Sequence, residues 1–332
     1  MLQDEDCLFS NERTKLSNFL PEINKQQIIN FIFDGLTSTP KKISSVFFYD
    51  SKGSKLFEQI TNLPEYYLTK IERELIRRFA VSMCRELCHT DIIELGSGDC
   101  SKISIILDSI GSENLNTVCY KPLDVSISAL RESAEILNRK YPQLSVHCIA
   151  ADFISQLHLV PSERKNLFCF FGSTIGNLSY EQRDCLLKKI ALQMDQDDTL
   201  LIGTDMVKPK DVLERAYNDK SNITALFNRN ILSVVNSITG TNFDPQSFEH
   251  LAFYNENESR MEMHLRALNK MIIESESSDF KIIINNGELI HTENSHKFTV
   301  AQISRQIEEA ELKIERIISD DRKWFSLVQI SK

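Results

Sequence analysis

The chain has 332 residues, 42% of them hydrophobic, and a formal net charge of −9. This length exceeds what one compact core usually needs, so we expect either two domains or one large domain with a long insertion. Nucleic acids and anionic membranes are bound by clustered basic side chains, so an acidic chain argues against both as partners. No apolar run approaches the roughly 20 residues of a membrane span, and we predict a cytoplasmic protein.

The hydrophobic pattern predicts a change of architecture along the chain. The first seventy residues are expected to be helical with turns, and residues 24–38 carry apolar side chains at helical spacing. From about residue 71 to 206, helices alternate with short apolar runs that indicate strands. Such alternation predicts a parallel sheet with helices on both faces, whose ligand crevice lies at the carboxyl ends of the strands. The expected strands are residues 91–96, 118–124, 145–152, 166–173 and 199–205.

Residues 91–98 give the best single clue to the chemistry. An apolar run is followed by Gly96 and Gly98, and glycines suit a sharp turn that a ligand approaches closely, because they have no Cβ. The third glycine of a dinucleotide-binding fingerprint is missing, and no Gly-Lys-Ser/Thr follows, so a pyrophosphate cradle and a P-loop are both disfavoured. What remains is the turn of an S-adenosylmethionine (SAM) methyltransferase, and we predict a Rossmann-like class I fold.

Acidic residues at the ends of the next two strands support this interpretation. Asp124 ends an apolar stretch, and its carboxylate can accept hydrogen bonds from both hydroxyls of an adenosine ribose. Asp152 and Phe153 end the following strand, where they would form an acceptor for the adenine amino group beside an apolar wall. One acid at a strand end is ordinary. With Glu94, the acid of the apolar run before the glycine turn, Asp124 and Asp152 make three in succession, and together with that turn they favour a SAM site.

After Asp205 the pattern changes. Residues 209–236 predict two or three helices, and residues 247–290 predict strands of a separate, antiparallel layer. Residues 300–331 return to an amphipathic helix and a closing strand. We therefore predict two domains: a SAM-dependent methyltransferase domain of residues 71–206 and 298–332, and an α+β substrate-binding domain of residues 18–70 and the insertion 207–297.

The cysteines do not indicate a metal or a disulfide framework. All eight are scattered, several of them inside apolar runs where a reduced thiol behaves as a small hydrophobe. Cys84, Cys88 and His89 could be taken for a metal cluster, but no second Cys/His pair follows at ligand spacing. We predict no metal.

Several longer strings resemble one enzyme family. They occur in family order from about residue 20 to the C-terminus, and they are similar to the histidine-specific Nα-methyltransferases of ergothioneine biosynthesis. The strings are FFYDSKGSKLFEQITNLPEYYLTKIERE (47–74), FGSTIGNLS (171–179), GTDMVKPKDVLERAYND (203–219), ITALFNRN (223–230), RMEMHLRA (260–267) and TENSHKF (292–298).

The resemblance implies that SAM trimethylates the α-amine of L-histidine to give hercynine. It implies SAM contacts at Gly96, Lys102, Asp124, Asp152 and Phe153. It implies L-histidine contacts at Tyr66, Asn177, Tyr217, Glu293 and Ser295, with Tyr49 and Met263 nearby.

Each implied substrate role makes chemical sense. The amide of Asn177, in a turn after an apolar strand, and the hydroxyl of Tyr217 can both donate to the amino-acid carboxylate. Glu293 and Ser295 lie two apart, so in an extended segment they point to one side and can bind the two imidazole nitrogens. Taken singly, each of these residues would more often be an ordinary turn, helix or loop position.

The remaining implied residues bear on the methyl transfer itself. Tyr49, Tyr66 and Met263 offer aromatic faces and a thioether, which suit a methylated ammonium whose charge is spread. Only the free amine can attack the methyl group, so each cycle must release a proton. The motifs contain no obvious general base. We predict that water near Tyr49 takes the proton, and the catalytic residue is otherwise unknown.

Two alternatives stay open. Another amino-acid N-methyltransferase on this fold could act on a tryptophan derivative, although a carboxylate at Glu293 would be buried at a cost beside an unpaired indole face. A non-catalytic SAM-binding regulator is the alternative of a different class, but it would have no reason to keep an amino-acid pocket. We predict a monomer that takes a small-molecule substrate.

Overall fold

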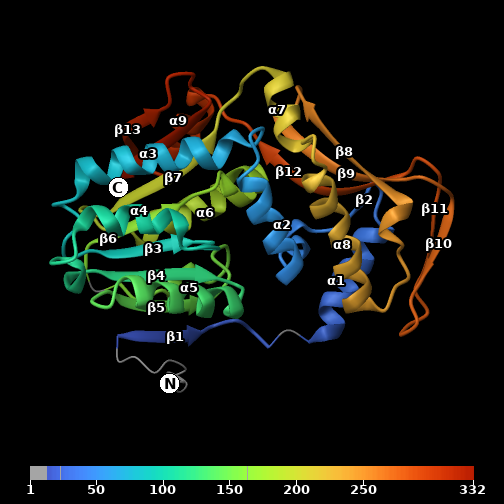
Figure 1. Cartoon of the computed structure of the whole chain (residues 1–332), viewed down its shortest axis with the longest axis horizontal. Helices are drawn as coiled ribbons and strands as arrows, with labels where there is room; N and C mark the ends of the chain where they lie inside the picture. Colours follow the sequence, from blue (N-terminus) through green and yellow to red (C-terminus); the bar gives the residue numbers. More distant parts are fainter. Residues whose placement is uncertain (1–12, 23, 163) are drawn as a thin grey trace. The chain divides into compact units, whose positions relative to one another are not determined.

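The computed structural model describes residues 13–22, 24–162 and 164–332 (Figure 1). Contacts between residues divide the chain into two compact units. The first unit contains the described residues up to Pro21, together with Ile71–Met206 and Phe298–Lys332. The second unit contains Glu22–Lys70 and Val207–Lys297.

An eight-stranded mixed sheet forms the centre of the first unit, in the order β1-β5-β4-β3-β6-β7-β14-β13. The pairs from β1 to β7 are parallel, whereas β14 is antiparallel to both β7 and β13. This confirms the predicted α/β, Rossmann-like sheet. The strands are β1 (Thr14–Asn18), β3 (Asp91–Leu95), β4 (Cys119–Asp124), β5 (Ser145–Ala150), β6 (Asn166–Phe170), β7 (Thr199–Asp205), β13 (Lys313–Ser319) and β14 (Phe325–Ser331).

The helices of this unit begin where the sequence supplies a cap. Ser126 accepts a hydrogen bond from the backbone N–H of Ala129 at the start of α5, and Thr299 and Gln302 form a capping box at the start of α9. The helices between and beside the strands are α3 (Tyr67–Met83), α4 (Ser101–Ile110), α5 (Ile127–Lys140), α6 (Tyr180–Gln193) and α9 (Val300–Glu309). The boundary between the units, after Lys70, lies within α3.

The central strands are buried along their whole length. Every residue of β3 and of β6 is buried, as expected for parallel strands that are covered on both faces. Ile93 and Phe168 belong to a core cluster that also contains Leu186 and Ile190 of α6. This rigid layer holds the carboxyl ends of β3, β4 and β5 side by side (Figure 1).

The second unit contains a four-stranded sheet in the order β2-β12-β9-β8 and a two-stranded ribbon. The pairs β12–β9 and β9–β8 are antiparallel, as predicted for this region. Its strands are β2 (Lys41–Lys42), β8 (Phe248–Asn255), β9 (Arg260–Ala267), β10 (Met271–Glu274), β11 (Lys281–Ile284) and β12 (Leu289–His296). Its helices are α1 (Lys25–Thr37), α2 (Ser51–Thr61), α7 (Lys210–Tyr217) and α8 (Ile223–Thr239).

Helix α8 connects the parts of the second unit. It packs against α2, and it also contacts β8 and β9 (Figure 1). Phe227, Ile231 and Val235 are buried along it at helical spacing. The helix ends at Gly240, whose φ of +68° is the left-handed conformation that glycine adopts without strain. Side chains of α8 therefore reach both the aromatic residues around α2 and the antiparallel sheet.

Three strands, β1, β2 and β13, were not predicted. Strand β1 lies in the segment that was expected to be helical, and it pairs in parallel with β5 from Thr14 to Asn18. Residues 18–21, which the domain prediction gave to the second domain, accordingly fall in the first unit. Strand β13 pairs with β14 at the other edge of the sheet. Like these two strands, the short β2 lies at the edge of its sheet, and all three have few buried residues, so their local pattern is weak.

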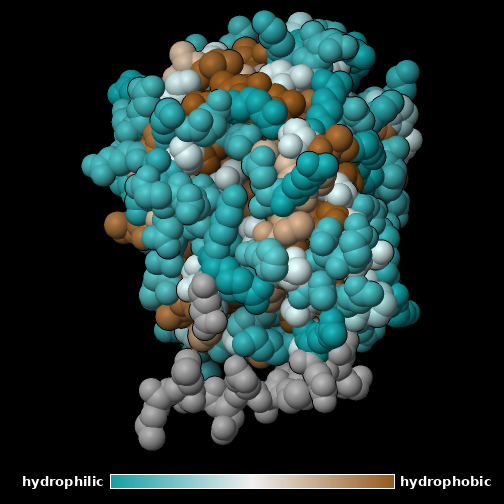
Figure 2. Space-filling model, turned by 90° about the vertical axis from the view of Figure 1, so that its left-hand side faces the viewer, coloured by the Kyte–Doolittle hydropathy of each residue, from teal (hydrophilic) through white to brown (hydrophobic). Residues whose placement is uncertain are grey.

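Hydrophilic side chains cover most of the face shown in Figure 2, and hydrophobic side chains lie between them in several areas. In the part of the chain that the structure describes, no helix is both long enough and apolar enough to cross a membrane.

The described cysteines are free thiols. Cys7 lies outside the described residues.

Candidate functional site

The glycine turn after β3 has the backbone that its sequence predicts. Gly96 and Gly98 have φ angles of +66° and +49°, a region that residues with a Cβ rarely adopt. The N–H groups of Gly96 and Ser97 both donate to the carbonyl of Leu123, at 2.8 and 3.3 Å. A Cβ built on Gly96 would lie 3.6 Å from the ring of Phe153. The turn therefore presents bare backbone beside the end of β5.

Asp124 ties this turn to the end of β4. Its Oδ2 accepts a hydrogen bond from the N–H of Gly98 at 3.2 Å, and its Oδ1 accepts one from the N–H of Ser126 at 2.9 Å. Burial raises the pKa of the Asp124 carboxyl, while these backbone hydrogen bonds oppose the rise. The carboxylate thus stands at the sheet edge predicted for the ribose, with each oxygen already oriented.

Asp152 and Phe153 occupy the turn after β5. Asp152 accepts hydrogen bonds from the N–H of Ile154 at 3.0 Å and from the hydroxyl of Ser155 at 2.6 Å. The ring of Phe153 meets that of Phe170 edge-on, with centroids 5.4 Å apart. The structure therefore brings the Gly96–Gly98 turn, Asp124, Asp152 and Phe153 to one edge of the sheet.

Lys102, the remaining predicted SAM contact, takes part in an ion pair. Its ammonium lies 2.8 Å from Oε2 of Glu72, and Oε1 of Glu72 accepts a hydrogen bond from the N–H of Gly172 at 2.6 Å. Glu72 is only 1% exposed. It was missed in the sequence, because an acid in the polar pattern of α3 gives no local sign of burial.

Asn177 ends a short 3₁₀ helix (Thr174–Asn177) in the loop after β6. Ser173 precedes this helix in the left-handed conformation, with φ of 55°, and its Oγ accepts a hydrogen bond from the N–H of Asp205 at 2.9 Å. The loop is thereby fixed between Glu72, which holds Gly172, and the end of β7. Asn177 belongs to the first unit, whereas the other predicted histidine contacts belong to the second.

Tyr217 and Ser295 meet in the second unit. The hydroxyl of Tyr217 donates to Oγ of Ser295 at 2.8 Å. The ammonium of Lys297 lies 2.8 Å from the same Oγ and 3.0 Å from the hydroxyl oxygen of Tyr217. Lys297 is 1% exposed and was not predicted. Its place two residues after Ser295, in line with Glu293 and Ser295, was the signal that could have identified it.

Glu293 lies directly opposite Met263 where β12 pairs with β9. The register of this pair shifts between His291 and Glu293, which is a β-bulge. Bulges re-aim the side chains that follow them. Beyond this bulge Glu293 and Ser295 are two residues apart in one strand, so their side chains lie on the same face of the sheet, as their spacing predicted.

The predicted tyrosines form one aromatic cluster within the second unit. The rings of Tyr66 and Tyr217 lie 6.5 Å apart, and Phe57 lies 6.4 Å from Tyr66 and 5.8 Å from Tyr49. Phe227 of α8 contacts both Tyr49 and Phe57. Tyr49 is 48% exposed. The structure thus gathers Tyr49 and Tyr66 on the same cluster as Tyr217.

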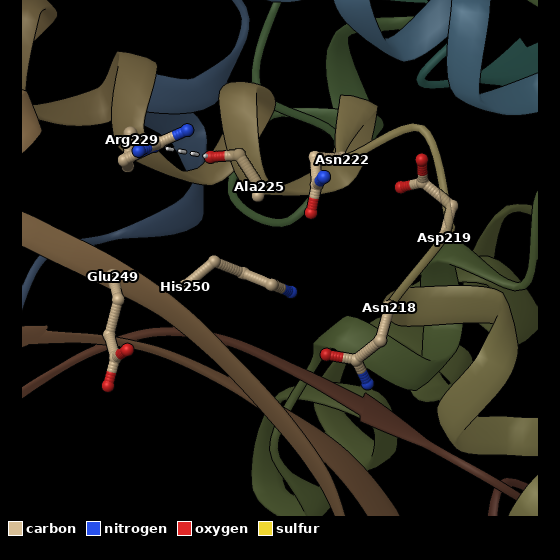
Figure 3. A pocket seen from close by; sticks show the side chains of 7 residues that line it. All are labelled: Asn218, Asp219, Asn222, Ala225, Arg229, Glu249 and His250. Atoms are coloured by element: carbon tan, nitrogen blue, oxygen red, sulfur yellow. Dashed lines mark hydrogen bonds between the residues drawn. The ribbon is translucent and has the colours of Figure 1, made fainter.

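A polar cavity of about 320 Å³ lies beside the loop that follows Tyr217 (Figure 3). None of its lining residues is a predicted histidine contact. They are Asn218, Asp219, Asn222, Ala225, Arg229, Glu249 and His250.

Comparison with known proteins decides the family. A family model described as histidine-specific methyltransferase, SAM-dependent, matches residues 26–332. The chain belongs to this family. The family prediction made from the sequence is therefore confirmed, and with it SAM as the methyl donor.

Relatives within the family cover almost the whole chain. The histidine N-alpha-methyltransferase of Mycobacterium tuberculosis (strain CDC 1551 / Oshkosh) is 36% identical over 302 residues, which are 91% of this chain and 94% of the relative. The protein of the same name from Mycolicibacterium smegmatis is 37% identical over 84% of this chain and 87% of the relative. Among solved structures, the mitomycin 7-O-methyltransferase MmcR has a TM-score of 0.50 at 10% identity and covers 93% of this chain and 67% of that chain. This likeness shows the methyltransferase fold alone.

The residues of this histidine-specific methyltransferase form two chemically different groups. At the sheet edge of the first unit, exposed backbone and a carboxylate suit a nucleoside. In the second unit, two hydroxyls and an ammonium meet beside aromatic rings, and the carboxylate of Glu293 lies two residues before Ser295 on β12. No group of His, Cys, Asp and Glu side chains that could hold a metal ion occurs among the residues that the structure describes.

Proposed function

We propose that this protein transfers methyl groups from SAM to the α-amino group of L-histidine three times and so forms hercynine. In this proposal the first unit binds SAM, and the second unit supplies most of the contacts to histidine. The observation that carries the choice of substrate is the pair Glu293 and Ser295 on one face of β12, beyond the bulge. A carboxylate and a hydroxyl at this spacing match the two nitrogens of an imidazole ring.

SAM fits the residues at the edge of the first sheet. The bare backbone of Gly96 admits a nucleoside where a Cβ would point toward Phe153, and Asp124 offers a carboxylate to ribose hydroxyls. In the proposal Asp152 accepts a hydrogen bond from the adenine amino group and Phe153 packs on the ring. SAM, when bound, supplies an electrophilic methyl group. Lys102 remains a predicted contact, held in place by Glu72.

The hydrogen-bond directions around Ser295 favour a neutral imidazole. Lys297 is a donor only, and Tyr217 donates to Ser295, so Oγ of Ser295 accepts two hydrogen bonds. The hydrogen of the Ser295 hydroxyl is then left to donate to a ring nitrogen that carries no proton. Glu293, as a carboxylate, accepts from the ring nitrogen that carries one. The pair therefore specifies one neutral tautomer of histidine.

The carboxylate of the substrate is assigned to Asn177 and Tyr217. The amide of Asn177 can donate one hydrogen bond to it. The hydroxyl hydrogen of Tyr217 points to Ser295 in this structure, so its donation to a carboxylate requires a turn of that hydroxyl. Both roles stay predictions.

The reaction depends on positioning and on loss of a proton. Holding a neutral amine close to the methyl group removes translational and rotational freedom, an advantage that can reach about 7 to 11 kcal/mol. Tyr49 and Tyr66 present aromatic faces that suit a methylated ammonium. Tyr49 is exposed enough to have water beside it, and this water is the proposed proton acceptor.

The test is a survey of substrates. The purified protein is incubated with SAM and with each of the twenty amino acids in turn, and the products are identified by mass spectrometry. We expect a mass gain of three methyl groups on histidine alone. A tryptophan product would support the first alternative, and SAM binding with no methylated amino acid would support the non-catalytic regulator.

The predicted setting is part of the proposal. We propose a cytoplasmic monomer that needs no metal. Because the chain is acidic overall, we also propose that it binds neither nucleic acid nor an anionic membrane. Light scattering after size-exclusion chromatography tests the oligomeric state. Activity after treatment with a chelator tests the metal.

A further inference from the structure

We infer that Asn228 is a positioning residue for histidine binding, because one amide group holds the backbone that carries three of the proposed contacts. The inference rests on the proposed function. Asn228 lies on α8 and is fully buried, at 0% exposed. It was not singled out by the sequence, where ITALFNRN shows only a polar position in an amphipathic helix.

The amide of Asn228 is bonded to three separate strands. Its Nδ2 donates to the carbonyl of His264 on β9, at 2.9 Å, and lies 2.9 Å from Nδ1 of His250 on β8. Its Oδ1 accepts a hydrogen bond from the hydroxyl of Thr292 on β12, at 2.8 Å. Both hydrogens and the oxygen are therefore used, which fixes the amide in one orientation.

The first connection leads to Tyr217. Nε2 of His250 lies 2.8 Å from the backbone carbonyl oxygen of Tyr217. A carbonyl only accepts, so Nε2 carries the hydrogen and Nδ1 accepts the hydrogen bond from Asn228. Burial lowers the pKa of His250, which keeps this neutral tautomer. Asn228 thus holds the end of α7 through His250.

The second connection leads to Met263 and Glu293. The hydroxyl of Thr292 lies 3.0 Å from the carbonyl oxygen of Met263 as well as 2.8 Å from Asn228, and its hydrogen is shared between them. Thr292 is the residue immediately before Glu293, within the bulge of β12. Since the bulge decides where Glu293 points, Asn228 and Thr292 together set the direction of the carboxylate.

Because of the cavity beside Tyr217, the loss of the different hydrogen bonds should weaken histidine binding to different extents. Figure 3 shows His250 extending from β8 toward the loop of Asn218 and Asp219, at the wall of the cavity. Water from this cavity can replace hydrogen bonds lost when His250 is changed. Asn228 and Thr292 are buried, at 0% and 1% exposed, so their lost bonds leave unsatisfied groups. We expect the effect on histidine binding to decrease from Asn228 to Thr292 to His250.

Asn236, a half-buried residue on the same helix, provides a control with a similar set of hydrogen bonds. Its Nδ2 donates to the carbonyl of Phe243 at 2.7 Å, and its Oδ1 accepts from the N–H of Phe243 and the hydroxyl of Thr241, both at 2.9 Å. It too bonds with three groups, but these lie in the loop after α8 and include no proposed histidine contact. Asn236→Leu therefore reports the loss of a comparable polar network alone.

The experiment compares Asn228→Leu with Asn236→Leu. Measurements are the melting temperature, the Kd for S-adenosylhomocysteine by calorimetry, and kcat and KM for histidine. We expect both variants to lose stability. Only Asn228→Leu should raise the KM for histidine, by about tenfold, and its kcat should change less than its KM. The Kd for S-adenosylhomocysteine should stay within about twofold of the wild-type value. Equal KM values in the two variants would reduce Asn228 to a structural residue.

Thr292→Val keeps the test decisive if Asn228→Leu does not fold. It removes one hydroxyl at nearly constant volume, and we expect it to raise the KM for histidine by about threefold. An unchanged KM in Thr292→Val contradicts the inference. Failure of the proposed function is a separate result, because it appears in the wild-type protein as absence of histidine methylation.

Discussion

The predicted SAM contacts lie at the ends of three neighbouring parallel strands, at Gly96, Asp124 and Asp152. The proposed histidine contacts of the second unit come instead from five separate segments between Tyr49 and Ser295. In the first unit the carboxylates of Asp124 and Asp152 accept hydrogen bonds from the residues that directly follow them, and Asp124 accepts one more from Gly98 in the neighbouring turn. In the second, side chains are oriented by partners far along the chain, such as Lys297 for Tyr217. Local sequence therefore specifies the first arrangement, and packing specifies the second.

The largest expected effect is the loss of histidine selectivity in Glu293→Ala. Removing a charged acceptor from a buried donor costs about 1.5 to 3 kcal/mol or more, so kcat/KM for histidine should fall roughly ten- to a hundredfold or further. The selectivity for histidine over tryptophan should shrink, because the enlarged pocket no longer holds a carboxylate. Kinetics with both substrates measure this.

Asn177→Ala is the control for Glu293→Ala. Its proposed partner is the carboxylate common to all amino acids, so it should lower the activity on both substrates alike. An unchanged ratio of histidine to tryptophan activity in Glu293→Ala would remove the specificity role of Glu293.

Glu94, on β3 just before the glycine turn, should make the stability of the protein depend on pH. Burial raises its pKa to about 8, and Tyr120 donates a hydrogen bond to it at 2.5 Å. A carboxyl whose pKa is raised on folding stabilises the folded state while it is protonated. This contribution is complete below about pH 4.5 and is lost as the pH rises through about 8. Between pH 6 and 8 the free energy of unfolding should fall by on the order of 2 kcal/mol.

Glu94→Gln isolates this contribution. The amide stays neutral at every pH and still offers an oxygen to Tyr120, so the decline should be smaller in the variant. Urea titrations at pH 6, 7 and 8 give the free energies. Parallel declines in both proteins would show that Glu94 does not titrate in this range.

Asp124→Ala tests whether the strand-end carboxylates of the first unit serve SAM. We expect the affinity for SAM to fall by about tenfold, equivalent to about 1.4 kcal/mol, because the ribose loses a charged acceptor. Calorimetry with SAM measures it. Asp124 also orients Gly98 and Ser126, so the melting temperature is needed beside the affinity. An unaltered affinity in a folded variant would end this assignment.

A smaller effect is expected from Lys297→Met. Without the ammonium, the hydroxyls of Tyr217 and Ser295 can exchange donor and acceptor roles, so the preference for a neutral imidazole should weaken. We expect the KM for histidine to rise by about fivefold at pH 8, equivalent to about 1 kcal/mol. Kinetics at pH 8 test this, with the affinity for SAM as the control. A KM equal to that of the wild type would exclude a role for Lys297 in binding.

The sequence determined the parts of this protein that short-range rules govern. The alternation of helices and strands predicted the parallel sheet, and Gly96 and Gly98 marked a turn that only glycine adopts easily. Long family-like strings predicted the family, which the comparisons confirmed. Edge strands β1 and β13 escaped prediction, because an exposed edge does not require a continuous apolar pattern.

Only the tertiary structure decided which polar side chains are buried and what they hold. Glu72, Asn228 and Lys297 look like solvent-facing positions in the sequence, yet each is almost completely buried among hydrogen-bond partners from distant segments. A buried polar group is stable only when such partners satisfy it. No local pattern records those partners, because they are supplied by the folding of the whole unit.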